Sequence, residues 1–312
     1  MATPNIRPLT DHLQKVAIKE LNERPERLAE DLKALKTWAE KEPHLNPRLD
    51  DQLLVGFLRG CKFSLEKAKS KLDWFYTLKT KYPDFYTIPN VDDPSVLERL
   101  SYGSGCLLPT PLNENGPRIM FVRAGNYPAD KYTLKDIMAV SHAQQELWIR
   151  EDDYATVNGF IDILDVSRLT TAHFASHTPN VIKKMLVFAE KAIPLRQRAT
   201  HFINFPPSFY TIFNMLKPLM PAKQQERLYV HDNNLESLYT HVPQKYLPKE
   251  YGGENGSLEE ITQISKQFFL DRRDYLHEDL KYRNNESLRK GKQPDYEGIF
   301  GVEGSFRKLD VD

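Results

Sequence analysis

Four basic residues occur in pairs whose spacing would suit binding of an anion. Arg196 and Arg198 are two apart in a segment expected to be extended, so their side chains point the same way. Lys223 and Arg227 are four apart in a segment expected to be helical, so they also share a face. On spacing alone, solvation of the surface explains these residues better than a binding site does. If the fold gathers them, they would suit the phosphates of an anionic membrane surface, at about 1 kcal/mol for each basic residue.

Motifs for catalysis and metal binding are not found in the sequence. There is no G-x-S-x-G elbow, no G-x-x-x-x-G-K-[ST] phosphate loop, no H-E-x-x-H motif and no paired C-x-x-C. The nine histidines lack the spacing of metal ligands, and adjacent acidic residues such as Asp152 and Asp153 diverge on a helix. The sequence therefore indicates no catalytic residue, no metal site and no cofactor.

A strongly apolar segment, PPSFYTIFNMLKPLMP at 206–221, lies between the two basic pairs. The prolines at its ends predict a short independent helix over 208–217. Its apolar side chains cover roughly 220° of the helix, which is more than one partner surface can bury. Two interpretations remain open. The helix is sunk in a core, or it covers an apolar space on one side and meets something apolar on the other.

Composition limits the class of protein. A chain of 312 residues is longer than the ~250 to 300 residues that one core supports, so two domains are expected. Lys plus Arg and Asp plus Glu are both 43, which argues against nucleic-acid binding. The two cysteines, Cys61 and Cys106, are typical of a reducing compartment. The N-terminus lacks an apolar signal region and no run approaches the ~20 apolar residues of a membrane span, so a soluble intracellular protein is expected.

Hydrophobic periodicity predicts an N-terminal all-helical bundle at 1–95, followed by an α/β domain at 96–275. Helical spacing in the bundle recurs at 9–21, 28–38, 53–58 and 65–78. In the second domain, short apolar runs alternate with helical stretches, which indicates parallel strands joined by right-handed crossovers. The expected strands are 106–108, 118–122, 159–166, 200–205 and 228–230, and the expected helices are 133–150, 178–192 and 208–217.

A capping-box pattern at Ser257 and Glu260 predicts one last helix to about Tyr275. The remaining residues, 276–312, are assigned to a C-terminal tail. Its polar stretch at 281–293 is typical of a segment that either follows the surface or is disordered.

The chain resembles the CRAL-TRIO family of carriers for lipophilic ligands over about residues 10–275. The segments that carry the resemblance are LLVGFLRGCKF at 53–63, GFIDILDV at 159–166, PNVIKKM at 179–185, IPLRQR at 193–198, HFINFPPSF at 201–209, FNMLKP at 213–218 and LPKEYGG at 247–253. The resemblance implies a helical bundle and a lipid-binding domain with a mainly parallel sheet, one enclosed apolar cavity and a mobile helical gate. The gate corresponds to the apolar segment at 206–221.

The resemblance also implies the site residues. The expected gate residues are Phe209, Ile212, Phe213 and Leu216. The expected cavity wall consists of Met138, Ser141, His142, Gln145, Leu164, His177, Ile182, Met185, Phe188, Ile193 and Leu195. The positions that bind a phosphoinositide headgroup correspond to Arg196, Arg198, Lys223 and Arg227, and because all are basic here, the resemblance favours a binding site over solvation.

Two departures from the tocopherol carriers of the family are visible. His142, Gln145 and His177 place polar groups where those carriers are largely apolar, which weakens the expectation of tocopherol itself as the ligand. The tail at 283–312 looks like the tails of insect members.

The expected function is that of a non-enzymatic cytoplasmic carrier that associates transiently with membranes. It would hold a tocopherol, retinoid, carotenoid or similar isoprenoid lipid and transfer it at membranes that contain phosphoinositides. A mainly apolar pocket of ~300 to 1,000 Å³ with a few polar groups orients such a ligand without converting it. One alternative is a lipid-sensing adaptor that acts through a protein partner docked on the helical bundle. Another is an isomerase or hydrolase with a buried histidine, although His142 and His177 have no evident activating carboxylate in the sequence.

Overall fold

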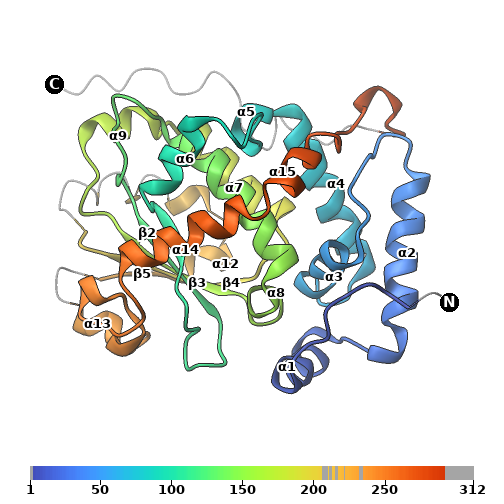
Figure 1. Ribbon diagram of the computed structural model, residues 1–312, viewed down its shortest axis with the longest axis horizontal. Coiled ribbons are helices and arrows are strands. Elements are labelled where there is room, and N and C mark those ends of the chain that lie inside the picture. The colour runs from blue at the N-terminus through green and yellow to red at the C-terminus, as the bar shows by residue number, and fades with distance from the viewer. Residues whose placement is uncertain are drawn as a thin grey trace.

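The computed structural model describes residues 3–291 except 206–209, 211–212, 215–216, 221 and 232–234. It has a helical bundle on one side and a five-stranded sheet on the other, and the C-terminal helices run from the sheet back to the bundle (Figure 1).

Helix α3 (Asp51–Gly60) is at the centre of the bundle. The side chain of Asp50 accepts a hydrogen bond from the Leu53 backbone N–H and so caps the helix, and every residue from 52 to 59 is buried. The surrounding helices are α1 (Asp11–Leu21), α2 (Leu28–Lys41) and α4 (Leu65–Lys81), followed by the short α5 (Pro83–Tyr86) and α6 (Pro94–Ser101). The helical bundle expected from the periodicity is therefore present.

The sheet has the order β1-β2-β3-β4-β5. Its strands are β1 (Gly105–Leu107), β2 (Arg118–Arg123), β3 (Phe160–Asp165), β4 (Gln197–Ile203) and β5 (Leu228–Val230). Strands β2 to β5 are parallel, as expected, whereas β1 is antiparallel to β2. The expected mainly parallel sheet is therefore present, and β1 is antiparallel because the loop between β1 and β2 is too short to contain a crossover helix.

The connections between the parallel strands are helical. Helices α7 (Leu134–Glu151) and α8 (Asp153–Asn158) join β2 to β3. Helices α9 (Thr171–Ser176) and α10 (Pro179–Val187) and a π-helical turn, η2 (Phe188–Ala192), join β3 to β4. Because the strands follow one another across the sheet, right-handed crossovers place these helices on one face.

The two faces of the sheet have different neighbours. Ile119, Phe121 and Ile163 point to one face and pack with Leu258 and Ile261 of α14 (Leu258–Leu270). A short helix, α13 (Glu236–Tyr239), covers the same face. Successive side chains of a strand alternate, so the opposite face consists of Met120, Val122, Asp162, Leu164, Thr200 and Phe202. We call this opposite face the inner face.

The bundle and the sheet domain meet at close contacts. A Cβ atom added at Gly60 would lie 1.7 Å from the Pro194 carbonyl oxygen, so only glycine allows α3 to approach the segment before β4. Lys79 of α4 is buried between Glu146 of α7 and Asp279, at 2.6 Å from each carboxylate. Burial, together with the charge of Asp279, raises the pKa of Glu146 to about 7.

The chain after the sheet returns to the bundle. The single helix expected to about Tyr275 is interrupted near Asp271, so α14 is followed by a separate α15 (Arg273–Asp279). The next residues, 280–291, form the C-terminal segment, which includes the 3-10 turn η6 (Glu286–Leu288).

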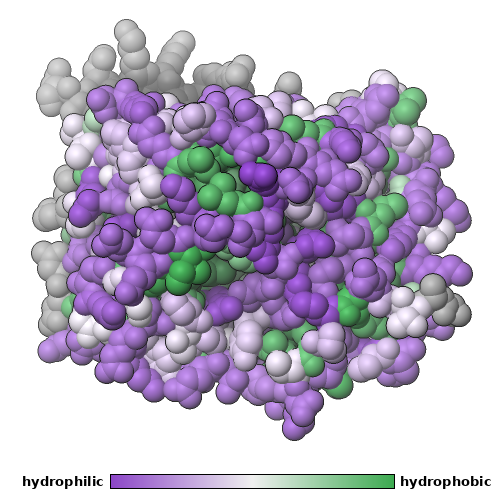
Figure 2. Space-filling view, viewed as in Figure 1, coloured by the Kyte–Doolittle hydropathy of each residue, from purple (hydrophilic) through white to green (hydrophobic). Residues whose placement is uncertain are grey.

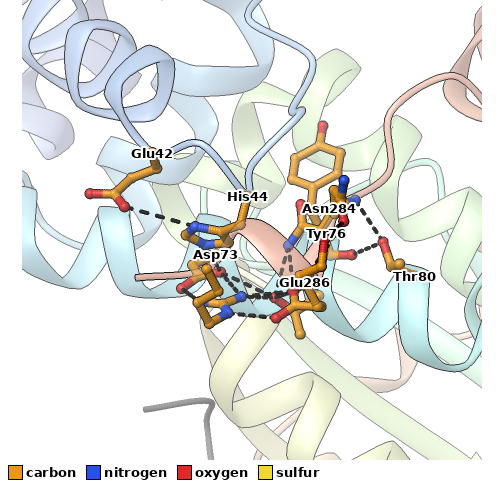
Figure 3. Close-up of polar contacts among 11 residues, drawn as sticks. Glu42, His44, Asp73, Tyr76, Thr80, Asn284 and Glu286 are labelled. Atoms are coloured by element: carbon orange, nitrogen blue, oxygen red, sulfur yellow. Dashed lines mark hydrogen bonds and ion pairs between the residues drawn. The ribbon is translucent and has the colours of Figure 1, made fainter. Parts of the chain in front are cut away.

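Polar contacts hold this C-terminal segment to α4. Figure 3 shows Asn284 and Glu286 pointing between Asp73 and Thr80. The Asn284 backbone N–H donates to Thr80 Oγ1 at 2.9 Å, and Arg289 donates to both carboxylate oxygens of Asp73 at 2.7 and 2.8 Å. Of the two expectations for the tail, its described part matches a segment that follows the surface, and 292–312 lie outside the described residues.

Replacing Arg289 with alanine is expected to lower the free energy of unfolding by about 2 kcal/mol. The guanidinium is only 6% exposed, and its loss leaves Asp73 without a bidentate, charge-assisted partner. Urea denaturation would measure the change. The matched control is Lys290→Ala, because Lys290 is exposed and should contribute less than about 0.5 kcal/mol. Identical transition midpoints for the two variants would contradict this role of the C-terminal segment.

Candidate functional site

Helix α10 is apolar but incompletely buried. The side chain of Thr178 accepts from the Val181 backbone N–H, and Pro179 occupies the first turn, which fixes where the helix starts. Every residue from 181 to 186 is partly exposed, and Ile182 and Met185 lie one turn apart on the same side. Part of the apolar surface of α10 is therefore not packed against other residues.

The inner face below this region is also incompletely covered. Leu164 of the central strand β3 pairs in register with Val122 of β2 and Phe202 of β4. Helices normally bury both faces of a parallel sheet, yet Leu164 and Val122 remain partly exposed. Part of the apolar surface of Leu164 and Val122 therefore remains accessible on the inner face.

Helix α7 also carries partly accessible side chains. Met138, Ser141 and Gln145 recur at helical spacing and are all partly exposed, and Gln145 Nε2 donates to Ser141 Oγ at 3.4 Å. Met138 packs against the same core cluster as Met185 of α10 and Val122 of β2. Partly accessible, mainly apolar side chains thus occur on four elements, β2, β3, α7 and α10. We group them as the candidate site: Val122, Met138, Ser141, Gln145, Leu164, Ile182 and Met185.

Other predicted wall residues are fully packed. Phe188 is 1% exposed, and its ring lies 4.3 Å from that of Tyr86 and 4.4 Å from that of His142. Ile193 and Leu195 are buried in the same cluster. These residues form the partition between the bundle and the candidate site, so their contact with a ligand stays a prediction.

The two predicted histidines contact backbone carbonyl groups. His142 Nδ1 lies 3.1 Å from the Phe85 carbonyl oxygen, and burial lowers the pKa of His142 to about 3, so the ring is neutral and Nδ1–H donates. His177 is partly exposed, its Nδ1 lies 2.6 Å from the His173 carbonyl oxygen, and burial lowers its pKa as well. Neither contact supplies the carboxylate that would activate a histidine as a base.

The expected gate is described only in part. Phe209, Ile212 and Leu216 lie outside the described residues. Phe213 is 7% exposed and its ring lies 5.3 Å from that of Phe202, in a cluster that includes Leu164. Tyr210 is 38% exposed, although its ring contacts Phe205. The described residues of this segment therefore include one aromatic ring packed over the inner face and one facing outward.

Three of the four predicted anion-binding residues meet at the start of β4. Arg227 Nη1 donates to the Gln197 carbonyl oxygen at 2.6 Å, and Arg198 Nε donates to the Asn158 carbonyl oxygen at 3.0 Å. Arg196 donates to the Val157 carbonyl oxygen, and burial, followed by the charge of Arg198, lowers the pKa of Arg196 to about 10. Lys223 is exposed on α12 (Ala222–Gln225), one turn before Arg227.

The bundle adds two charged residues that the sequence pattern did not reveal. Glu20 of α1 accepts from Arg198 Nη2 at 3.0 Å, and this hydrogen bond, with the charges of Arg198, Arg196 and Lys62, lowers the pKa of Glu20. Lys62 therefore belongs to the same basic region. No spacing in the sequence links residues 20 and 62 to residue 198, because the link exists only once the bundle docks on the sheet.

The described part of the chain contains neither a candidate metal site nor a candidate membrane-spanning helix. In that part of the chain, no group of three or more His, Cys, Asp or Glu side chains is placed to hold a metal ion. Among the described helices, none combines the length and the apolar character needed to cross a bilayer.

Two family models match different parts of the chain. Residues 103–253 match the model of the CRAL/TRIO domain, and residues 24–96 match that of the Pinta-like, UBA domain. The human alpha-tocopherol transfer protein-like protein is 29% identical over 255 residues, covering 81% of this chain and 73% of its own. Mouse clavesin-2 is 29% identical over 235 residues, covering 75% and 71%. The crystal structure of Sfh5 aligns with 86% of this chain and 99% of its own at 14% identity and a TM-score of 0.48.

Proposed function

Since residues 103–253 of this chain form a CRAL/TRIO domain, we propose that the protein binds a hydrophobic small molecule over the inner face of its sheet and carries it between membranes. One observation carries the proposal. Apolar side chains of the central strands, α7 and α10 remain partly accessible, where a folded chain without a ligand would be expected to bury them. The name of the human relative, alpha-tocopherol transfer protein-like, supports the same class of function.

The chemistry of the candidate site defines the class of ligand. Within the candidate site, apolar contacts come from Val122, Met138, Leu164, Ile182 and Met185, and polar ones from Ser141 and Gln145. Such a lining favours a long apolar body with a small polar group, as in tocopherols, retinoids, carotenoids and similar isoprenoid lipids. No residue in it has a role in a reaction under this proposal, so the ligand leaves unchanged.

The basic region at the start of β4 would hold the protein to a membrane. We place the headgroup of a phosphoinositide beside Arg198 and Arg227, with Arg196 and Lys223 adding charge, while the neighbouring segment at 206–221 inserts. The face that carries α14 is mostly hydrophilic with small separate apolar patches, so it suits contact with water rather than with lipid (Figure 2). The protein would then be cytoplasmic and associate with membranes transiently.

Removing exposed charge from the basic region should slow transfer without weakening ligand binding. The test variant is Arg198→Ala with Lys223→Ala, since both side chains are exposed whereas that of Arg196 is largely enclosed. Transfer of fluorescent retinol to vesicles containing phosphoinositide should fall roughly thirtyfold at low salt, from the loss of two contacts of about 1 kcal/mol each. The difference should shrink at high salt as screening weakens the wild type.

The matched control replaces two exposed lysines elsewhere, Lys245 and Lys249, with alanine. It should transfer at the wild-type rate. Equal rates for the test variant and the control at low salt would rule out the electrostatic step. Loss of retinol binding by the test variant would show instead that these residues support the fold.

A second candidate function, that of a lipid-sensing adaptor, is favoured by a feature of the bundle. An open groove of about 580 Å³ lies between α2 and α4, and Trp38, Leu65 and Lys69 are among the residues that line it. A protein partner docked in this groove would signal whether the protein holds its ligand. An adaptor would form stable complexes without accelerating transfer between vesicles, whereas a carrier accelerates transfer with no partner present.

A further inference from the structure

A carboxyl group lies in the middle of the inner face. Asp162 belongs to the central strand β3 and is two residues before Leu164, so both side chains project from the same face. It pairs in register with Met120 of β2 and Thr200 of β4. The next row along the face is Val122, Leu164 and Phe202, so this carboxyl group is adjacent to apolar side chains of the candidate site.

Two neutral side chains of β4 accompany Asp162. Gln197 Nε2 donates to Asp162 Oδ2 and also lies 2.9 Å from Thr200 Oγ1. Burial raises the pKa of Asp162 to about 7, and hydrogen bonds from Gln197 and Thr200 oppose the rise only in part. Over the described ranges, no lysine, arginine or histidine forms an ion pair with Asp162. A buried carboxyl without a counter-charge is costly in an apolar environment, and a ligand group that donates to it would lower this cost.

We infer that Asp162, Gln197 and Thr200 form the polar end of the ligand site and bind the hydroxyl group of a lipid alcohol. This inference rests on the proposed carrier function and specifies its ligand. A carboxylate has about four acceptor positions, and the two side chains of β4 occupy only some of them. The amide and hydroxyl of Gln197 and Thr200 offer both donors and acceptors. A hydroxyl group also both donates and accepts, so it can pair with Asp162 and with Gln197 or Thr200 at once, whereas a fatty acid would place a second negative charge beside Asp162.

The geometry also orients the ligand. Residues two apart in a strand are separated by about 6.6 Å, so a lipid whose apolar body covers Leu164 can place its terminal hydroxyl at Asp162. Its apolar end then points along β3 toward Phe202 and Phe213, in the cluster next to the expected gate. The polar group then lies at the end of the ligand that is farther from the expected gate.

Two pairs of probes test this inference: all-trans-retinol against its methyl ether, and α-tocopherol against its methyl ether. Each ether keeps the apolar body and loses the hydroxyl donor. The full-length wild type should bind the alcohol of at least one pair about tenfold or more tightly than the ether, as expected for a hydrogen bond to a charged group. Asp162→Val should bring the ratio close to one. Asp162→Asn keeps an acceptor without the charge and should retain part of the preference.

The matched control is Asp165→Asn. Asp165 is a buried aspartate of the same strand, but it projects to the opposite face, where Tyr251 donates to it. Its substitution should leave the alcohol preference unchanged.

The outcomes separate this inference from the function on which it rests. Wild-type protein that binds neither member of either pair would overturn the carrier function for these lipid classes and the hydroxyl site with it. Tight binding with no preference for the alcohol would overturn the hydroxyl site alone. An alcohol preference that is unchanged in Asp162→Val would also overturn the hydroxyl site. If that variant does not fold, an Asp162→Asn variant with the wild-type ratio of alcohol affinity to ether affinity would overturn it instead.

Discussion

Replacing Phe188 with alanine is expected to lower the free energy of unfolding by about 3 to 5 kcal/mol, the range typical of a phenylalanine removed from a packed core. Its ring is stacked on Tyr86 at an angle of 15°, and the ring of Phe75 lies 5.8 Å away on the bundle side. The substitution would open a cavity where α4, α5 and η2 meet. It should therefore loosen the docking of the bundle on the sheet domain.

Equilibrium urea denaturation followed by circular dichroism would measure this loss. Glu190→Ala, two residues later on the same turn and exposed, is the control and should change stability by less than about 0.5 kcal/mol. Phe188→Leu should give a smaller loss than Phe188→Ala, because it keeps most of the apolar volume. A loss below about 1 kcal/mol in Phe188→Ala would show that the partition between the bundle and the site is not packed as described.

Replacing Leu164 with tryptophan should abolish ligand binding, by at least about 100-fold, while the protein stays folded. Leu164 is partly exposed, so the larger ring should project into the region over the inner face where the ligand is proposed to lie. A ligand would need that space. Steric exclusion of a hydrophobic body from a preformed site removes most of its apolar contacts, and each buried methylene is worth about 0.8 kcal/mol.

The neighbouring residue provides the control. Ile163 is on the same strand, points to the α14 face and is 0% exposed, so Ile163→Trp should be overpacked and destabilise the protein by about 1 to 3 kcal/mol or more. Binding of retinol and urea denaturation would be measured for both variants. Unaltered binding by Leu164→Trp, or equal destabilisation by the two substitutions, would contradict an unfilled space at the inner face.

The sequence was informative where local pattern decides structure. The strand expected at 159–166 is found as Phe160–Asp165, and the expected capping box is formed by Ser257 and Glu260 at the start of α14. Both depend on residues close in the chain. The direction of β1 could not be predicted because an apolar run does not show its own direction, and the π-helical turn at Phe188–Ala192 was predicted as the continuation of a helix.

The candidate site could be predicted only in part from the sequence. Resemblance placed Leu164 and Met185 on a cavity wall, and the structure leaves both partly exposed. Asp162 was read as one residue of an apolar strand, since its hydrogen bonds come from Gln197, a residue 35 positions away. Glu20 and Lys62 were missed for the same physical reason, because their approach to Arg198 depends on how the bundle docks on the sheet.

Native mass spectrometry of the full-length protein, after incubation with a total cellular lipid extract and removal of free lipid, tests the carrier function most directly. We expect a single 1:1 complex with one small lipid alcohol for the wild type, and only the free chain for Leu164→Trp. A wild-type spectrum that shows only the free chain, or the same bound species on both proteins, would contradict a ligand site over the inner face.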